Sequence, residues 1–207
     1  MGLHPVTHAC VSCTAARKVR EIAEEEQAPL VWVEVAAVNP GQEGVAAPPP
    51  WTRVLLPGSE AGPVRILGPP RGDLLGALAF VLEDLASGAK PTAEDWNEVL
   101  PRLRRRHHFR VFSAFRCADV PPVVRHLARV VHTSPERLAL DVVDVDTFPE
   151  MARHYGVRFM PTVTLDDFAH FYGPPDERHL AHAIADVLPS GGFTYAGPRG
   201  DNPLGSF

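Results

Sequence analysis

The sequence predicts an α/β fold made of two consecutive units of the same design. Apolar, β-branched runs that are typical of buried strands alternate in each half with segments of helical periodicity. Each half also has the same order of features: a cysteine, a helix, a buried strand, a proline, a β-hairpin and a helix. Cys10 precedes Pro50 by 40 positions, and Cys117 precedes Pro161 by 44. A repeat of this length indicates two related units.

The first half begins with a helix after Cys13, where apolar residues recur at helical spacing. The run LVWVEVAAV is almost entirely apolar, which favours a strand buried on both faces. PGSEAG has the composition of a hairpin turn, and Gly88 is a suitable residue to end a helix. The expected elements of this half are the helix after Cys13, strands at 30–38, 52–56 and 63–67, and a helix over 72–88.

The second half repeats the pattern from residue 108 onward. HFRVFSAF predicts a strand that ends close to Cys117, and the helix that follows has prolines in its first turn, where they are tolerated. RLALDVVDVD predicts a second buried strand, and TVTL-DD-FAHFYG predicts a hairpin. The expected elements are strands at 108–115, 137–146, 162–165 and 168–173, and helices at 118–132, 147–157 and 176–188.

Composition restricts the classes of partner. The chain of 207 residues has a formal net charge of −5 and a pI near 6.0, which argues against nucleic acid. Three cysteines are too few for a disulfide framework and fit a reducing compartment, so we expect a cytoplasmic protein. No apolar stretch reaches membrane-spanning length, and the first residues lack the features of a secretory signal, so we expect no membrane contact.

The repeated pattern resembles the thioredoxin fold. Two such units in tandem look like the glutaredoxin-like protein disulfide oxidoreductases of thermophilic prokaryotes, and also like the N-terminal domain of the flavoprotein subunit of alkyl hydroperoxide reductase. The residues that carry this resemblance are CVSC at 10–13, the segment 50–94, CADVPPVV at 117–124 and VRFMPTV at 157–163. The resemblance implies two tandem thioredoxin-like units with a mixed central sheet flanked by helices, the two sheets being joined into one.

The expected organisation has four parts. An N-terminal unit, 1–96, carries the Cys-x-x-Cys sequence, and a linking helix occupies 97–106. A C-terminal unit, 107–189, carries a single cysteine. The last segment, 190–207, is rich in glycine and proline, and we expect a flexible tail.

The resemblance implies a thiol–disulfide oxidoreductase in which Cys10 is the nucleophile and Cys13 the resolving thiol. A thiol at a helix N-terminus has a lowered pKa because the free N–H groups and the helix dipole favour the thiolate. Pro50 matches the cis-proline of the family, next to which a substrate peptide docks. Its predecessor, Pro49, has no N–H to offer such a peptide.

The second half has a different combination of features. Cys117 stands at the nucleophile position, but Val120 replaces the resolving thiol. Met160 and Pro161 match the docking pair, so this half forms a possible second site. Asp119 shares the same helix start and should raise the pKa of the Cys117 thiol. A single thiol can form a mixed disulfide, or it can be a small apolar residue at a helix end.

Alternatives remain open for the first pair of thiols. Together with His4 and His8 they have the ligand types of a zinc site, although two histidines in an extended segment would not converge. They can also be inert. We expect redox chemistry without a metal or cofactor, on protein or low-molecular-weight thiol and disulfide substrates, with a reductase or peroxidase as a possible partner. The alternative function is a redox-inactive thioredoxin-fold module that binds another protein.

Overall fold

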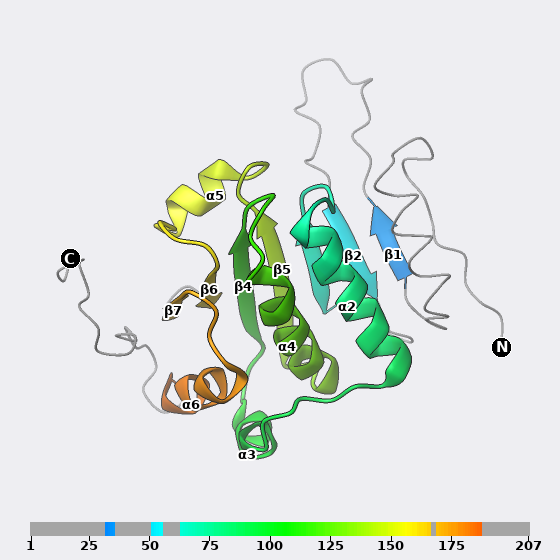
Figure 1. The fold of residues 1–207 in the computed structure, drawn as a ribbon. Helices are drawn as coiled ribbons and strands as arrows, with labels where there is room; N and C mark the ends of the chain where they lie inside the picture. Colours follow the sequence, from blue (N-terminus) through cyan, green and yellow to red (C-terminus); the bar gives the residue numbers. More distant parts are fainter. Residues whose placement is uncertain (1–31, 36–50, 56–62, 167–168, 188–207) are drawn as a thin grey trace.

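The computed structural model describes residues 32–35, 51–55, 63–166 and 169–187 of the chain, and it has the expected α/β architecture (Figure 1). The strands are β1 Trp32–Val35, β2 Trp51–Leu55, β3 Val64–Leu67, β4 His107–Ser113, β5 Leu138–Asp144, β6 Thr162–Leu165 and β7 Ala169–Tyr172. The helices are α2 Asp73–Ser87, α3 Asp95–Val99, α4 Val120–Thr133, α5 Pro149–His154 and α6 Glu177–Val187, with a 3₁₀ turn η1 at Leu100–Arg102.

One mixed sheet contains all of these strands, in the order β1-β2-β3-β5-β4-β6-β7. The second half supplies β5-β4-β6-β7: β4 is parallel to β5 and antiparallel to β6, and β6 and β7 form a hairpin. In the hairpin turn Asp166 adopts a positive φ of 51°. Its carboxylate accepts the backbone N–H of His108 at 2.8 Å, which ties the turn to β4.

The two halves join edge to edge through β3 and β5, which run parallel. This confirms the expectation of a single extended sheet. Arg65 of β3 adds a bidentate ion pair with Asp141 of β5, at 2.8 and 2.7 Å. In the first half β1 pairs directly with β2, whereas in the second half β4 lies between the corresponding strands β5 and β6. Among the residues that the structure describes, the first half therefore has no counterpart of β4.

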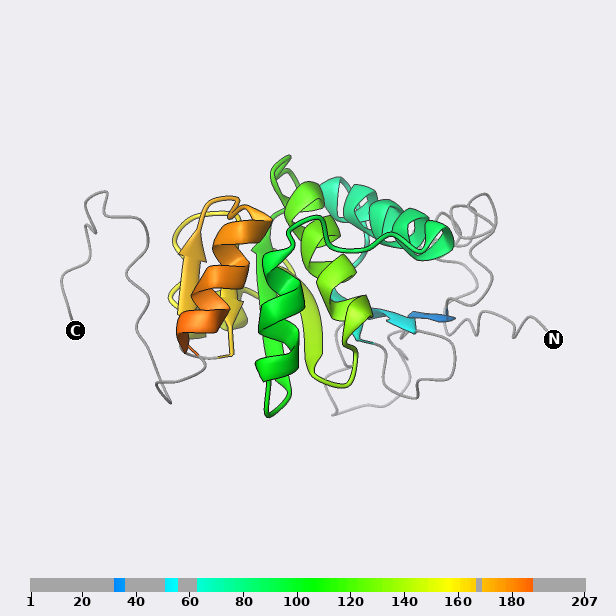
Figure 2. The same ribbon diagram turned by 90° about the horizontal axis from the view of Figure 1, so that it is seen from below.

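Helices α2 and α4, one from each half, pack against each other on one face of the sheet (Figures 1 and 2). As expected, α2 ends at Gly88, whose φ of 66° is left-handed and whose N–H bonds the carbonyl of Leu85 at 3.2 Å. Pro121 and Pro122 lie in the first turn of α4. One apolar core crosses the boundary between the halves; its fully buried members include Val64, Ile66, Leu78, Phe109, Val111, Leu127 and Leu140.

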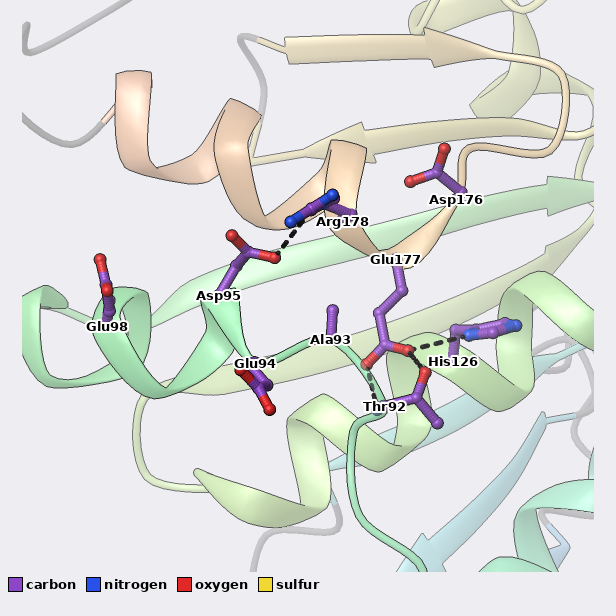
Figure 3. Close-up of a pocket in the computed structure, with 9 residues that line it drawn as sticks. All are labelled: Thr92, Ala93, Glu94, Asp95, Glu98, His126, Asp176, Glu177 and Arg178. Atoms are coloured by element: carbon purple, nitrogen blue, oxygen red, sulfur yellow. Dashed lines mark hydrogen bonds and ion pairs between the residues drawn. The ribbon is translucent and has the colours of Figure 1, made fainter.

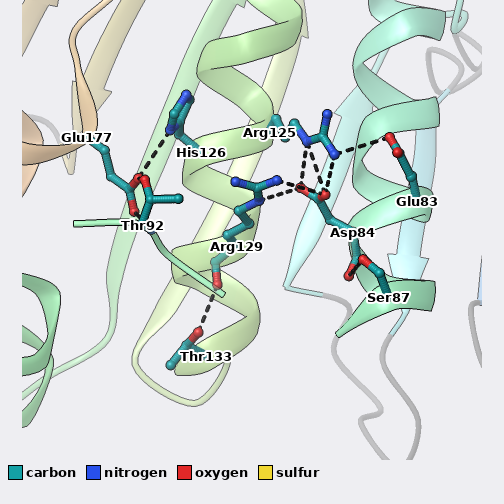
Figure 4. Close-up of polar contacts among 9 residues, drawn as sticks. All are labelled: Glu83, Asp84, Ser87, Thr92, Arg125, His126, Arg129, Thr133 and Glu177. Atoms are coloured by element: carbon teal, nitrogen blue, oxygen red, sulfur yellow. Dashed lines mark hydrogen bonds and ion pairs between the residues drawn. The ribbon is translucent and has the colours of Figure 1, made fainter. Parts of the chain in front are cut away.

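A buried ionic cluster holds α2 against α4 (Figure 4). Asp84 of α2 is 3% exposed and accepts hydrogen bonds from Arg129 at 2.6 Å and from Arg125 at 2.7 Å. Burial opposes ionisation of Asp84, but the bonds from the two guanidinium groups hold its pKa below the ordinary value. The two helices are therefore joined by these ion pairs as well as by their apolar contact, and the ion pairs favour one register between the helices.

The connection between the halves is helical over a shorter stretch than 97–106. The helical part of the connection begins with α3 at Asp95 and continues as η1, which contains Pro101 and ends at Arg102. Trp96 is buried in the common core, and α3 packs against α6. The predicted boundaries between the four parts stay a prediction, and the tail 190–207 lies outside the described residues.

Candidate thiol site at the start of α4

The register of the sheet places Cys117 and Pro161, the two features predicted for the second half, at the same end of the strands β4 and β6. Phe112, near the end of β4, pairs with Thr162, the first residue of β6. Cys117 follows β4 by four residues and Pro161 immediately precedes β6, so both lie beyond this end. The Met160–Pro161 peptide bond is cis. Pro161 is buried, and its carbonyl accepts the N–H of Gly173 at 2.9 Å.

The backbone of Cys117 is bonded on both sides. Its carbonyl accepts the N–H of Val120 at 2.9 Å, which forms the turn that opens α4. Its N–H donates to the carboxylate of Asp73 at 2.6 Å. The side chain is half-buried, and within the described ranges it is the one free thiol.

Several effects act on the Cys117 thiol. Burial raises its pKa, and the carboxylates of Asp119 and Asp73 raise it further. Hydrogen bonds from the N–H groups of Asp119 and Val120 act in the opposite direction but do not reverse the shift. The expected effect of Asp119 agrees in direction, although burial is the larger cause. At neutral pH the thiol is therefore mostly protonated and a slow nucleophile.

The first half contributes residues to this site that the sequence did not predict. Asp73 is the first residue of α2, and its own N–H bonds the carbonyl of Phe115 at 3.4 Å. Gly72 has φ of 54°, and a Cβ there would lie 2.3 Å from the same carbonyl oxygen. The guanidinium of Arg71 lies 5.3 Å from the centre of the Phe115 ring. Residues 71–73 thus hold the loop that carries Cys117.

Exposed apolar side chains surround this end of the strands. Phe115, Phe159, Met160 and Tyr172 are between 40% and 58% exposed, and they are the large hydrophobic residues exposed in the described part of the chain. The rings of Phe159 and Tyr172 are 6.3 Å apart in an edge-to-face arrangement. Such a group of exposed side chains favours contact with another apolar surface.

The residues predicted for the first site lie outside the described ranges: Cys10, Cys13, Pro49 and Pro50. The strand β2 begins at Trp51, directly after Pro50, in the same way that β6 begins directly after Pro161. The two prolines therefore correspond in structure as well as in sequence, to the extent that each directly precedes a strand of its own half.

A separate hollow of about 690 Å³ lies between residues 92–98, α4 and the start of α6 (Figure 3). The buried carboxylate of Glu177 accepts hydrogen bonds there from the backbone N–H of Thr92 at 2.9 Å and from the Thr92 hydroxyl, and His126 lies at 3.3 Å. These bonds attach the connection between the halves to α6. No set of three or more His, Cys, Asp or Glu residues in the described ranges is arranged to hold a metal.

Known proteins support the architecture. A crystal structure of a protein disulfide oxidoreductase from Aeropyrum pernix K1 matches with a TM-score of 0.66 and 18% identity, covering 92% of this chain and 98% of that one. The NTD_N/C domain of the alkyl hydroperoxide reductase AhpF of Enterococcus faecalis matches with a TM-score of 0.64 and 16% identity, covering 84% of this chain and 86% of that one. The chain has the thioredoxin fold.

At the level of sequence, a thioredoxin of Methanocaldococcus jannaschii is 26% identical over 78 residues, which are 38% of this chain and 92% of the relative. No family model matches the chain. Within the thioredoxin fold, the described second half is complete from β4 to α6, and the first half is represented by β1 to α2. Among the described residues no helix has the length and apolar character needed to cross a membrane.

Proposed function

We propose that this protein is a thiol–disulfide oxidoreductase that acts through Cys10 and Cys13. The observation that carries the proposal is a Cys-x-x-Cys sequence in a chain with the thioredoxin fold. The other half of the chain supports it: there the corresponding cysteine and proline, Cys117 and Pro161, lie beyond the same end of the paired strands β4 and β6. The sequence places Cys10 and Pro50 at a nearly equal separation.

In this mechanism the Cys10 thiolate attacks one sulfur of a substrate disulfide. A mixed disulfide forms, and the other sulfur leaves as a thiolate that takes up a proton. Cys13 then attacks the mixed disulfide, which releases the second substrate thiol and leaves Cys10 and Cys13 joined. The substrate gains two electrons and the protein loses them. A dithiol reductant, supplied by a partner reductase in a reducing cytoplasm, returns the pair to the thiol form.

Cys117 has a narrower role in this proposal. A resolving thiol is missing because Val120 occupies that position, fully buried in the core. Cys117 can therefore form a mixed disulfide but cannot complete a cycle alone. The exposed Met160, which precedes cis-Pro161, is a second surface for polypeptide substrates, whose backbone would pair with it as an added strand does.

The test is catalytic reduction of insulin with a dithiol reductant. Cys10→Ser should abolish turnover, and Cys13→Ser should abolish turnover while trapping mixed disulfides with partner proteins. The matched control is Cys117→Ser, which should retain turnover. Turnover by a chain that lacks both Cys10 and Cys13 would contradict the assignment.

The alternative is a redox-inactive module that binds another protein through the second half. The raised pKa of Cys117 and its exposed apolar surroundings favour it. Thiol titration distinguishes the two functions: a redox pair has one thiol of low pKa and a reversible two-electron midpoint. A Cys10 thiol with the pKa of free cysteine, and no partner trapped by Cys13→Ser, would establish the alternative.

A further inference from the structure

The Cys117 thiol has two carboxylate neighbours that come from different halves of the protein. Asp119 immediately precedes α4, the helix that Cys117 introduces. Asp73 begins α2 of the first half, 44 positions away in the sequence. Both carboxylates raise the pKa of the thiol, after the larger contribution of burial, so both act on the sulfur electrostatically.

Asp73 is held in place by bonds at both ends. Its carboxylate accepts the N–H of Cys117 at 2.6 Å, and its backbone N–H donates to the carbonyl of Phe115 at 3.4 Å. Backbone N–H groups at the start of a helix attract anions. At the thiol site the Asp73 carboxylate already accepts the Cys117 N–H. An anionic substrate therefore cannot bind this N–H, and it also meets the negative charge of Asp73.

The positively charged side chains near the thiol lie against the ring of Phe115. The guanidinium groups of Arg71 and Arg116 lie 5.3 and 5.8 Å from its centre. Arg71 is within 3.6 Å of the Asp144 carboxylate, and Asp146 accepts the Phe115 N–H at 3.2 Å. Arg71 is therefore partly offset by Asp144, and the charged groups that act on the thiol itself are the carboxylates of Asp119 and Asp73.

We infer that Asp73 determines which disulfides Cys117 reacts with, favouring cationic and neutral partners over anionic ones. The inference rests on the proposed thiol–disulfide chemistry and gives Asp73 the role of a specificity-determining residue. In the step concerned the Cys117 thiolate attacks a disulfide R–S–S–R, forming a protein–S–S–R bond and releasing R–S⁻, which takes up a proton. One substrate sulfur is reduced, and the protein sulfur is oxidised to the mixed disulfide.

The experiment uses the full chain with Cys10→Ser and Cys13→Ser, so that Cys117 is the one remaining thiol. Second-order rates of mixed-disulfide formation are measured with cystamine, bis(2-hydroxyethyl) disulfide and 3,3′-dithiodipropionate, which are cationic, neutral and anionic. The ratio of the cystamine rate to the dithiodipropionate rate is the readout. The thiolate fraction cancels in this ratio, because both reagents react with the same thiolate.

We expect the ratio to exceed one and Asp73→Asn to lower it severalfold, because the substitution removes a negative charge beside the thiol that acts with opposite sign on the cationic and the anionic reagent. Asp73→Glu should restore the preference. The matched control is Glu83→Gln, which removes a charge from the same helix about 15 Å farther along and should leave the ratio unchanged.

Salt provides a second measurement that needs no substitution at Asp73. Raising the ionic strength to about 1 M shortens the screening length to about 3 Å, so the ratio should approach one. A ratio that ignores salt, a ratio unchanged in Asp73→Asn, or no reaction with any of the three disulfides would overturn the inference. Insulin turnover depends on Cys10 and Cys13 and is measured separately, so failure of the proposed function would leave the selectivity of Cys117 intact.

Discussion

His132, near the end of α4, should make the protein less stable in mild acid. Burial lowers its pKa from 6.5 to about 4, and the carboxylate of Asp84 opposes the shift only in part. Its Nε2 atom is buried without a hydrogen-bond partner. The unfolded chain therefore binds a proton at this residue below pH 6.5, whereas the folded chain resists it until about pH 4.

The difference in pKa fixes the size of the effect. A gap of about 2.5 units corresponds to about 3 kcal/mol of stability that is present above pH 6.5 and lost as the pH falls to 4. Between pH 7 and pH 5 the loss should be about 2 kcal/mol. The carboxylates with lowered pKa, such as Asp84, do not interfere, because their contribution is lost only below about pH 4.

Urea unfolding at pH 5, 6 and 7 measures this contribution. His132→Leu removes the titrating group and the unpaired nitrogen, so its stability at pH 7 should equal or exceed that of the parent chain. Its loss between pH 7 and pH 5 should be about 2 kcal/mol smaller. The matched control is His154→Leu, which makes the same substitution at an exposed position and is measured in the same way. Equal pH dependence in His132→Leu and the parent would refute the reasoning.

Further substitutions test the contacts between the halves and the second thiol. Asp84→Asn should cost about 3 kcal/mol in urea unfolding because it removes the buried charge that pairs with Arg125 and Arg129; a loss below 1 kcal/mol would show that the cluster is solvated. Gly72→Ala should lower the free energy of unfolding by about 2 kcal/mol and change the rate at which Cys117 is alkylated, because its Cβ would meet the Phe115 carbonyl. If neither the stability nor the alkylation rate changed, this contact would be contradicted. Val120→Cys should create a second redox couple with Cys117, seen as two further thiols protected from alkylation after oxidation; their continued alkylation would count against the thiol geometry.

Local sequence signals predicted the ends of several described helices in both halves, because these signals have a direct physical cause. Prolines at 121 and 122 fit only the first turn of a helix, and Gly88 provides the left-handed conformation that ends α2. The connecting helix was expected to be longer. Pro101 has no N–H to continue an α-helix, and the chain instead forms the 3₁₀ turn η1 there.

Contacts between distant positions explain what the sequence could not reveal. An aspartate at a helix start suggests a favourable interaction with the helix dipole, so nothing in the sequence distinguishes Asp73 from any other acidic residue at an N-terminus. Its bond to the Cys117 N–H depends on how α2 packs beside α4. The cysteine and the proline, in contrast, were recognisable because their spacing recurs in both halves.

The parallel pairing of β3 with β5 has a consequence for any attempt to divide the protein. Each of these strands covers a hydrogen-bonding edge of the other half, and Arg65 and Asp141 neutralise each other across the joint. A fragment that starts after α2 would carry β5 as a bare edge with a buried carboxylate newly uncovered. Such an edge is a template for strands of other molecules, so separately produced halves should self-associate, whereas mixing them should restore a soluble pair.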